Sequence, residues 1–215
     1  MIPLSATMKR VSRPNRASSQ SKKPTFAKKS SQAGQIRIIG GKWRGRKLPV
    51  LDAEGLRPTT DRNKETLFNW LMGDVQDAQC LDVFAGSGGL GLEALSRYAQ
   101  SCVFIERDRQ NAQQLVKNIS TLAISDANVK CGDAFNELQA LAGQTFDIIF
   151  VDPPFHKGLI APTVSALVNY NIIASGGLVY MEHERELAET PLPNNWLVIK
   201  EKQTQALVYR LIKVS

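Results

Sequence analysis

The chain has 215 residues, of which 43% are hydrophobic and 22% are charged, and its formal net charge is +7. Its length suits one domain with a small addition, and its composition is that of a globular protein. The sequence contains no run of about 18 apolar residues, so no transmembrane helix is predicted. The cysteines, Cys80, Cys102 and Cys131, are too far apart for a disulfide framework or a close-spaced zinc site. We therefore expect a cytoplasmic protein without a metal site, whose cysteines are buried as small apolar residues.

The positive charge belongs to one segment of the chain. Residues 1–51 contain thirteen Lys and Arg and no Asp or Glu, whereas residues 52–215 carry fourteen basic and twenty acidic residues. A one-sided cluster of this kind is the electrostatic footprint of a polyanion-binding segment, although a solvated tail has a similar composition. We interpret the segment as one that contacts nucleic-acid phosphates.

Residues 1–34 are predicted to form a disordered basic tail, because they contain few large apolar residues. They also lack the apolar core of a signal peptide. Residues 35–55 are predicted to form a basic β-hairpin with its turn at Gly40 and Gly41. Aromatic and basic residues alternate there, as on surfaces that contact a nucleic-acid backbone. Packing within the hairpin explains Trp43 equally well.

Residues 56–215 are predicted to form one α/β domain. A helix over Asn63–Met72 has an apolar stripe, and strands and helices alternate after it. The predicted strands are Cys80–Ala85, Cys102–Glu106, Asn128–Cys131, Phe146–Val151, Gly177–Glu182, Trp196–Glu201 and Ala206–Ile212, and the helices between them are Leu90–Tyr98, Asp108–Leu122, Phe135–Ala142 and Ala161–Asn169. This alternation predicts a doubly wound, mostly parallel sheet with an antiparallel hairpin at its end.

Residues 81–91, LDVFAGSGGLG, run from a predicted strand through a glycine-rich turn into a helix. The spacing satisfies GxGxxG, which is typical of dinucleotide-binding folds. Asp82 argues against a pyrophosphate, because a carboxylate repels phosphate but accepts hydrogen bonds from an ammonium group. S-adenosylmethionine carries such a group and no phosphate. Glu106, at the end of the next strand, is placed to accept from ribose hydroxyls, and Asp133 to accept from an adenine amino group.

Residues 150–155, FVDPPF, end another predicted strand. Proline fixes φ and donates no backbone hydrogen bond, so the strand stops at Pro153. The Asp152 carboxylate, the rigid carbonyls and the Phe155 ring then lie at the carboxyl edge of the sheet, where α/β proteins bind ligands. This arrangement suits a flat, amine-bearing ligand such as a nucleobase.

In their order, these motifs resemble the class I S-adenosylmethionine-dependent methyltransferases that modify exocyclic amino groups. Residues 37–46, RIIGGKWRGR, together with 57–59, RPT, and 84–88, FAGSG, resemble more closely the bacterial methyltransferases that act on the N2 amine of a guanine in 16S rRNA. The resemblance extends over residues 56–215 and the hairpin, but not over the tail. It implies a Rossmann-like fold with a seven-stranded, mostly parallel sheet, a C-terminal antiparallel hairpin and a small N-terminal β-hairpin.

The resemblance also implies a cofactor, S-adenosyl-L-methionine, and a partner, the 16S rRNA of the small ribosomal subunit or of its assembly intermediate. We expect a cytoplasmic monomer without membrane contact. The implied cofactor residues are Asp82, Gly86, Ser87, Gly88, Glu106, Asp133 and Ala134, and the implied catalytic residues, which hold the base, are Asp152, Pro153, Pro154 and Phe155. We also predict the residues that contact RNA, which are Arg37, Lys42, Trp43, Arg44, Arg46, Lys47, Arg57 and Lys157.

Other functions compete with this one. An adenine-N6 methyltransferase acting on DNA or RNA is close, because Phe155 differs from the Tyr typical of that class only by a hydroxyl. An NAD-dependent oxidoreductase leaves Asp82 and the Pro-Pro turn unexplained, and a non-catalytic RNA-binding module leaves the cofactor strands unexplained. We interpret His156 and His183 as polar surface residues. The acids Glu182, Glu184, Glu186 and Glu189 are interpreted as a solvated face.

Overall fold

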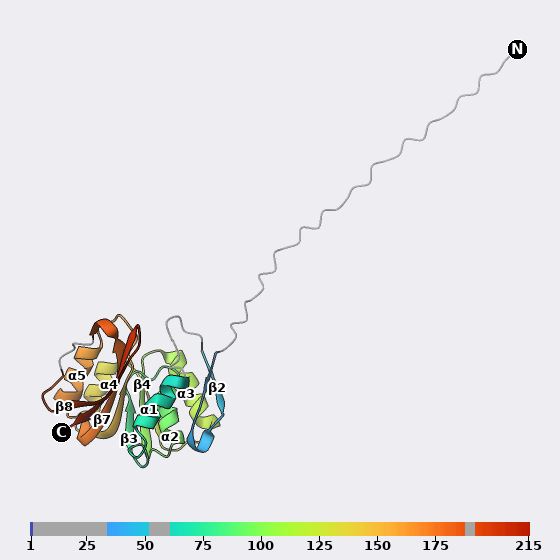
Figure 1. Cartoon of the computed structure of the whole chain (residues 1–215). Helices are drawn as coiled ribbons and strands as arrows, with labels where there is room; N and C mark the ends of the chain where they lie inside the picture. The colour runs from blue at the N-terminus through green and yellow to red at the C-terminus, as the bar shows by residue number, and fades with distance from the viewer. Residues whose placement is uncertain (2–33, 52–60, 188–191) are drawn as a thin grey trace. The chain divides into compact units, whose positions relative to one another are not determined.

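The computed structural model of the protein describes residue 1 and residues 34–51, 61–187 and 192–215 (Figure 1). Apart from Met1 and Gly34, the predicted basic tail lies outside the described residues, and so does Arg57. The described residues from 34 to 215 belong to one compact unit by their contacts. None of the helices in the described ranges is long and apolar enough to cross a membrane.

A seven-stranded sheet organises this unit. Its strands are β3 (Gln79–Asp82), β4 (Ser101–Glu106), β5 (Ala127–Cys131), β6 (Phe146–Val151), β7 (Ile173–Glu184), β8 (Trp196–Gln203) and β9 (Leu207–Val214). They lie in the order β5-β4-β3-β6-β7-β9-β8, and only β9 runs antiparallel to its neighbours. The chain moves from β3 outward to β5 and then crosses back to β6. This switch opens a crevice at the carboxyl ends of β3 and β6.

Helices cover both faces of the sheet (Figure 1). Residues of α1 (Asp61–Trp70), α2 (Gly89–Ser96) and α3 (Arg109–Thr121) join one apolar core, and residues of α4 (Ala134–Ala140) and α5 (Ile160–Asn169) join another. Alternate residues of each central strand point into the two cores, as the pleat of a strand requires. The predicted doubly wound, mostly parallel sheet is confirmed.

Local boundaries differ from the prediction where loops or packing intervene. Strand β3 ends at Asp82 rather than at Ala85, because the glycine turn begins there. Strand β7 spans Ile173–Glu184, twice the predicted length. The buried face of α1 consists of Lys64, Leu67 and Phe68, whereas Trp70 is only half-buried.

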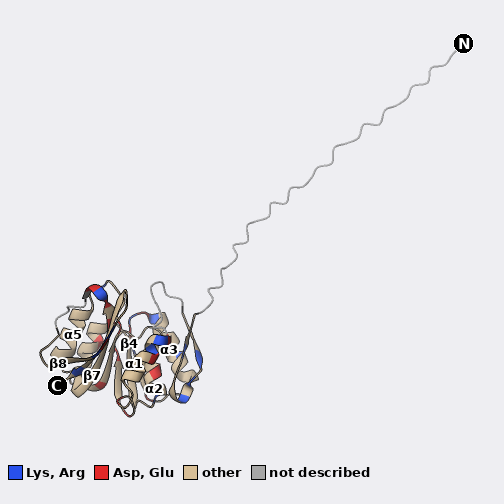
Figure 2. Ribbon diagram, in the orientation of Figure 1, with Lys and Arg blue, Asp and Glu red and all other residues tan. Residues whose placement is uncertain are grey.

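The predicted N-terminal hairpin is present. Strand β1 (Gly34–Arg37) pairs antiparallel with β2 (Lys47–Val50), and a short 3-10 helix, η1 (Gly41–Trp43), forms its tip. Its inward side chains, Ile36, Ile38, Leu48 and Val50, are buried in the same core as α1, α2 and α3. The hairpin is therefore part of the packed unit, with its basic residues on the outer side (Figure 2).

Polar groups of α2 fix the hairpin in place. The Ser96 hydroxyl donates a 2.6 Å hydrogen bond to the Gly40 carbonyl and accepts one of 3.0 Å from the Trp43 N–H. Glu93, which is fully buried, accepts from the Ile39 N–H at 2.9 Å. Gly41 has a φ of 71°, and a Cβ there would lie 1.8 Å from the Ser96 carbonyl oxygen. Only glycine permits this approach of the two backbones.

Candidate active site

The glycine turn connects β3 to α2, and its glycines have different functions. Gly86 has a φ of 52° and lies in the wall of the crevice. Gly88, which precedes α2 with a φ of 80°, does not line the crevice, and a Cβ there would lie 2.4 Å from Leu115. A Cβ on Gly91 would lie 2.2 Å from the Phe104 ring. Gly88 and Gly91 therefore allow α2 to pack closely, which the GxGxxG spacing alone does not reveal.

Two acids flank the turn. The Asp82 carboxylate, 2% exposed, accepts a 3.1 Å hydrogen bond from the Gly91 N–H. The Glu106 carboxylate accepts one bond of 2.7 Å from the Gly86 N–H and another of 2.7 Å from the Asp108 N–H. Glu106 thereby ties the end of β4 to the glycine turn, and its oxygens retain lone pairs directed to the crevice.

Burial shifts the titration of both acids. It raises the pKa of Asp82 from its ordinary 3.8 to about 7, and the neighbouring Asp152 and Glu106 carboxylates act in the same direction while the Gly91 N–H opposes them. Burial also raises the pKa of Glu106, against the effect of its backbone donors. A buried carboxylate of this kind favours a cationic ligand, because the cation stabilises its charged form.

The third predicted acid lies at the start of α4. The Asp133 carboxylate caps this helix by accepting a 3.0 Å bond from the Phe135 N–H. Asp133 and Ala134 both line the crevice, beside Ser87 of the glycine turn. Of the predicted cofactor residues, all except Gly88 line this one crevice. They are Asp82, Gly86, Ser87, Glu106, Asp133 and Ala134.

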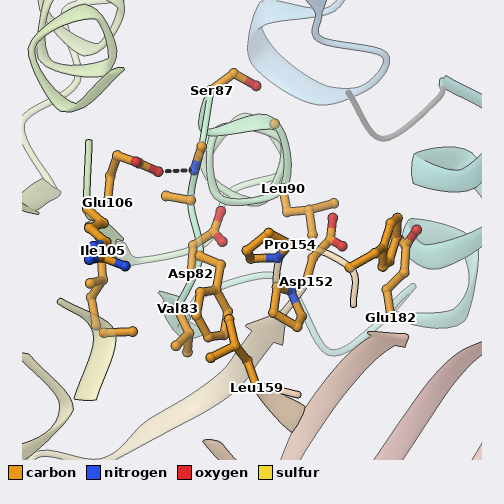
Figure 3. Close-up of a pocket in the computed structure, with 18 of the residues that line it drawn as sticks. Asp82, Val83, Ser87, Leu90, Ile105, Glu106, Asp152, Pro154, Leu159 and Glu182 are labelled. Carbon is orange, nitrogen blue, oxygen red and sulfur yellow. Dashed lines mark hydrogen bonds between the residues drawn. The ribbon is translucent and has the colours of Figure 1, made fainter. Parts of the chain in front are cut away.

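The predicted tetrapeptide borders the same crevice, a cavity of about 310 Å³ (Figure 3). Asp152, Pro153, Pro154 and Phe155 all line it. The segment after them turns sharply, since His156 has a φ of 58°. The His156 backbone N–H donates to the Glu184 carboxylate oxygen Oε1. The exposed His156 ring has its Nδ1 3.7 Å from the same oxygen. Glu184 therefore holds the loop that carries Phe155 against the end of β7.

None of the predicted RNA-binding residues that the structure describes lines the crevice. Lys42, Arg44, Arg46 and Lys47 are exposed on the hairpin, and Lys157 is exposed after the tetrapeptide. Trp43 is half-buried and packs against the core, with the Lys42 ammonium 5.0 Å from its ring centre. The Arg37 guanidinium pairs with Asp61 at 2.7 Å, which reduces its availability for phosphate.

Several residues of the crevice wall were missed from the sequence: Asn63, Lys64, Glu182 and Tyr209. Lys64 is 3% exposed and its ammonium donates to the Arg37 carbonyl. Burial lowers the pKa of Lys64, while the Glu93 and Asp61 carboxylates oppose that effect. The helical spacing could have predicted that Lys64 is buried, because it lies three positions before Leu67 on the apolar face of α1. The Asn63 amide donates to the Tyr209 hydroxyl at 2.8 Å.

Some assignments of exposure and burial made from the sequence are wrong. Glu182 and Glu184 are 4% and 7% exposed, so these two acids do not belong to a solvated face. Glu186 is exposed as predicted, and Glu189 lies outside the described residues. His183 is fully buried, with its Nδ1 2.7 Å from the Glu184 carbonyl. Cys131 is exposed, although Cys80 and Cys102 are buried as expected. The errors at His183 and Glu184 have one cause: β7 continues past its predicted end at Glu182, and the added residues of this central strand are buried.

Four carboxylates end four adjacent strands on one face of the sheet. Glu106 ends β4, Asp82 ends β3, Asp152 follows β6 and Glu182 lies near the end of β7. Two-residue periodicity places all of them on the face covered by α1 to α3. Figure 3 shows them in this order across the cavity. The end with Glu106 and Asp82 suits an adenosyl amino acid, and the end with Asp152 suits an amine-bearing base.

This fold and this crevice define a class I methyltransferase. The chain belongs to the family described as Conserved hypothetical protein 95, whose model matches residues 36–213. It is 53% identical over 181 residues to ribosomal RNA small subunit methyltransferase D of Escherichia coli, covering 84% of this chain and 91% of that one. The protein of the same name from Haemophilus influenzae is 49% identical over 83% of this chain and 93% of its own length.

Solved structures of methyltransferases superpose on this chain. YhhF of Escherichia coli superposes with a TM-score of 0.80 at 50% identity, covering 85% of this chain and 99% of that one. SMU.776, solved in complex with SAH, superposes with a TM-score of 0.66 over 88% of this chain and 58% of that one. At 14% identity, the second likeness concerns the fold alone.

Proposed function

We propose that the protein transfers a methyl group from S-adenosylmethionine to the N2 amine of one guanine in the 16S rRNA of the small ribosomal subunit or its assembly intermediate. The observation that carries the proposal is the tetrapeptide Asp152–Phe155 in the same crevice as Asp82 and Glu106. The named relatives are small-subunit rRNA methyltransferases, which supports an rRNA substrate. We infer a monomer that acts in the cytoplasm, where ribosomal RNA is found.

The residues of the crevice fit the cofactor. Buried Asp82 suits the α-ammonium group, and Glu106 suits the two ribose hydroxyls. Buried Lys64 suits the α-carboxylate, and Asp133 and Ala134 suit the adenine. The acids at the glycine turn do not suit a pyrophosphate, which disfavours the oxidoreductase alternative. S-adenosylmethionine supplies, when bound, a methyl group on a positively charged sulfur.

The tetrapeptide orients the base for transfer. The N2 amine is a weak nucleophile, because its lone pair is conjugated with the purine ring. If the Asp152 carboxylate and the Pro153 carbonyl accept its two hydrogens, the nitrogen becomes pyramidal and its lone pair points at the methyl group. Bound S-adenosylmethionine would supply the methyl group, so that the new N–C bond would form as its S–C bond breaks and one N2 proton would leave to solvent. Phe155 stacks on the flipped base.

Asp152→Ala tests the proposal. The variant should lose methyl transfer to small subunits from cells that lack the enzyme, while calorimetry finds S-adenosylmethionine affinity nearly unchanged. Equal loss of both would refute the assigned role of Asp152. Nucleoside analysis of the wild-type product should identify N2-methylguanosine, and N6-methyladenosine would favour the adenine alternative instead.

A further inference from the structure

Glu182 is the carboxylate that neither the cofactor nor the transfer step uses. Strands β6 and β7 are parallel, and their last registered pair is Val151 with Met181. The next residues, Asp152 and Glu182, therefore lie side by side on neighbouring strands, about 4.8 Å apart in the backbone. Both line the cavity, and Glu182 is 4% exposed (Figure 3).

A purine edge explains why two acceptors stand next to each other. Guanine presents two adjacent donors, the N2 amine and the N1–H, whereas adenine presents its amine beside an N1 lone pair. We propose that Glu182 is the specificity-determining residue, which accepts the guanine N1–H while Asp152 accepts a hydrogen of the N2 amine. This inference rests on the proposed function.

A neighbouring side chain orients the Glu182 carboxylate. The Tyr180 hydroxyl donates a 3.2 Å hydrogen bond to one of its oxygens, and the two side chains lie on the same face of β7. A carboxylate offers about four acceptor sites and can accept from several donors at once. Adenine would bring its N1 lone pair toward the carboxylate without a hydrogen between them, which is repulsive.

The order of the strands separates Glu182 from the cofactor end. Glu106 on β4 and Asp82 on β3 face the glycine turn, and β6 lies between β3 and β7. A cofactor held at β3 and β4 reaches the base at β6. Glu182, one strand further, then meets the side of the base remote from the methyl donor. Its removal should therefore alter the choice of base and leave cofactor binding intact.

The test uses a substrate analogue and a conservative variant together. The position methylated by the wild-type enzyme is first mapped on native small subunits from cells lacking the enzyme. Small subunits are then reassembled with 16S rRNA that carries either guanine or 2-aminopurine at that position. 2-Aminopurine keeps the 2-amino group but has no hydrogen on N1. Transfer of tritiated methyl is measured for the wild type, Glu182→Gln and the matched control Glu186→Gln, whose side chain is exposed.

We expect the wild type and Glu186→Gln to methylate guanine at least about 100-fold faster than 2-aminopurine, because a site built around a hydrogen bond rejects the analogue that lacks it. Glu182→Gln keeps an acceptor for Tyr180 but turns an N–H toward the base. Its guanine to 2-aminopurine ratio should fall at least about tenfold. The comparison of ratios cancels the effect of the oxygen that 2-aminopurine lacks at C6.

The outcomes that contradict the inference can be distinguished from those that contradict the proposed function. Equal wild-type rates on guanine and 2-aminopurine would overturn the inference and leave the proposed function standing, and this result needs no folded variant. Loss of S-adenosylmethionine affinity by Glu182→Gln, in proportion to its loss of activity, would make Glu182 a cofactor residue and also overturn it. A wild-type product other than N2-methylguanosine would overturn the proposed function and the inference with it.

Discussion

Ser96 and Gly40 are joined by a 2.6 Å hydrogen bond from the hydroxyl of the one to the carbonyl of the other, 56 positions apart in the sequence. The same hydroxyl accepts from the Trp43 N–H, so one side chain satisfies two backbone groups of the hairpin. The hairpin is thereby attached to the C-terminal end of α2. Since α2 starts at the glycine turn, it links the basic surface of the hairpin to the predicted cofactor site.

Ser96→Ala should therefore destabilise the protein. Two buried backbone groups lose their partner, and each such loss costs about 1–3 kcal/mol. Chemical denaturation measures the effect, and Ser165→Ala provides the control because its hydroxyl is exposed on α5. A change below about 0.5 kcal/mol, the usual range for surface substitutions, would show that the hairpin does not depend on this hydroxyl.

Gly41 and Gly45 offer a matched pair of substitutions in the hairpin. Both have positive φ, 71° and 83°, but a Cβ on Gly41 meets the Ser96 carbonyl at 1.8 Å, whereas none of the described residues lies within 4 Å of a Cβ on Gly45. Gly45→Ala should cost about 1 kcal/mol for the backbone conformation alone. Gly41→Ala should cost clearly more, because the hairpin must move away from α2. Equal unfolding free energies for the two variants would contradict the close approach.

Asp82 predicts a dependence of stability on pH. Its pKa in the folded protein is about 7 against an ordinary 3.8, so between these values the folded state binds the proton more strongly than the unfolded chain does. Stability should therefore decrease as the pH rises from about 4 to about 7. Asp82→Asn removes this contribution and should unfold at higher denaturant concentration than the wild type at pH 8.

Cofactor affinity should change with pH in the opposite direction. The ammonium group of S-adenosylmethionine requires the ionised Asp82, so binding should tighten from pH 6 to pH 8, by at most about tenfold per unit. Calorimetry on the wild type and on Asp82→Asn separates this effect from titration of the ligand. A pH profile that is identical in the two proteins would exclude Asp82 as the titrating group.

Glu106→Ala should weaken S-adenosylmethionine binding by about 10- to 100-fold. It removes the acceptor for the ribose and also the anchor for the Gly86 and Asp108 N–H groups, and hydrogen bonds to a charged group contribute about 1.5–3 kcal/mol each. Glu65→Ala, on the exposed side of α1, is the control. Unchanged affinity in calorimetry would refute ribose binding by Glu106.

The hairpin surface should bind phosphates of the RNA. Combined Arg44→Ala and Arg46→Ala should reduce the slope of log affinity for the small subunit against log salt by about 2, because each phosphate that a side chain neutralises adds about 0.9 to that slope. Lys200→Ala with Lys213→Ala removes the same charge from the far edge of the sheet and should leave the slope unchanged. Equal effects of the two double variants would indicate net charge rather than a specific surface.

Local motifs were predictable from the sequence, and long-range neighbours were not. Asp152 was identified because the strand, the two prolines and the aromatic ring are contiguous. Glu182 was assigned to a solvated surface, although it ended a predicted strand, because its burial depends on β7 lying between β6 and β9 in the sheet. Lys64 was missed for a related reason, since its partner is the carbonyl of Arg37 in another element.

The row of four carboxylates has a consequence for how a polyanion approaches. Phosphate groups are repelled from a cavity walled by Glu106, Asp82, Asp152 and Glu182, whereas the bases carry no charge. We therefore expect the cavity to admit an extruded nucleotide by its uncharged base and to keep the ribose-phosphate chain outside. The exposed basic residues of the hairpin do not line the cavity, and we expect them to attract the phosphates that the cavity excludes.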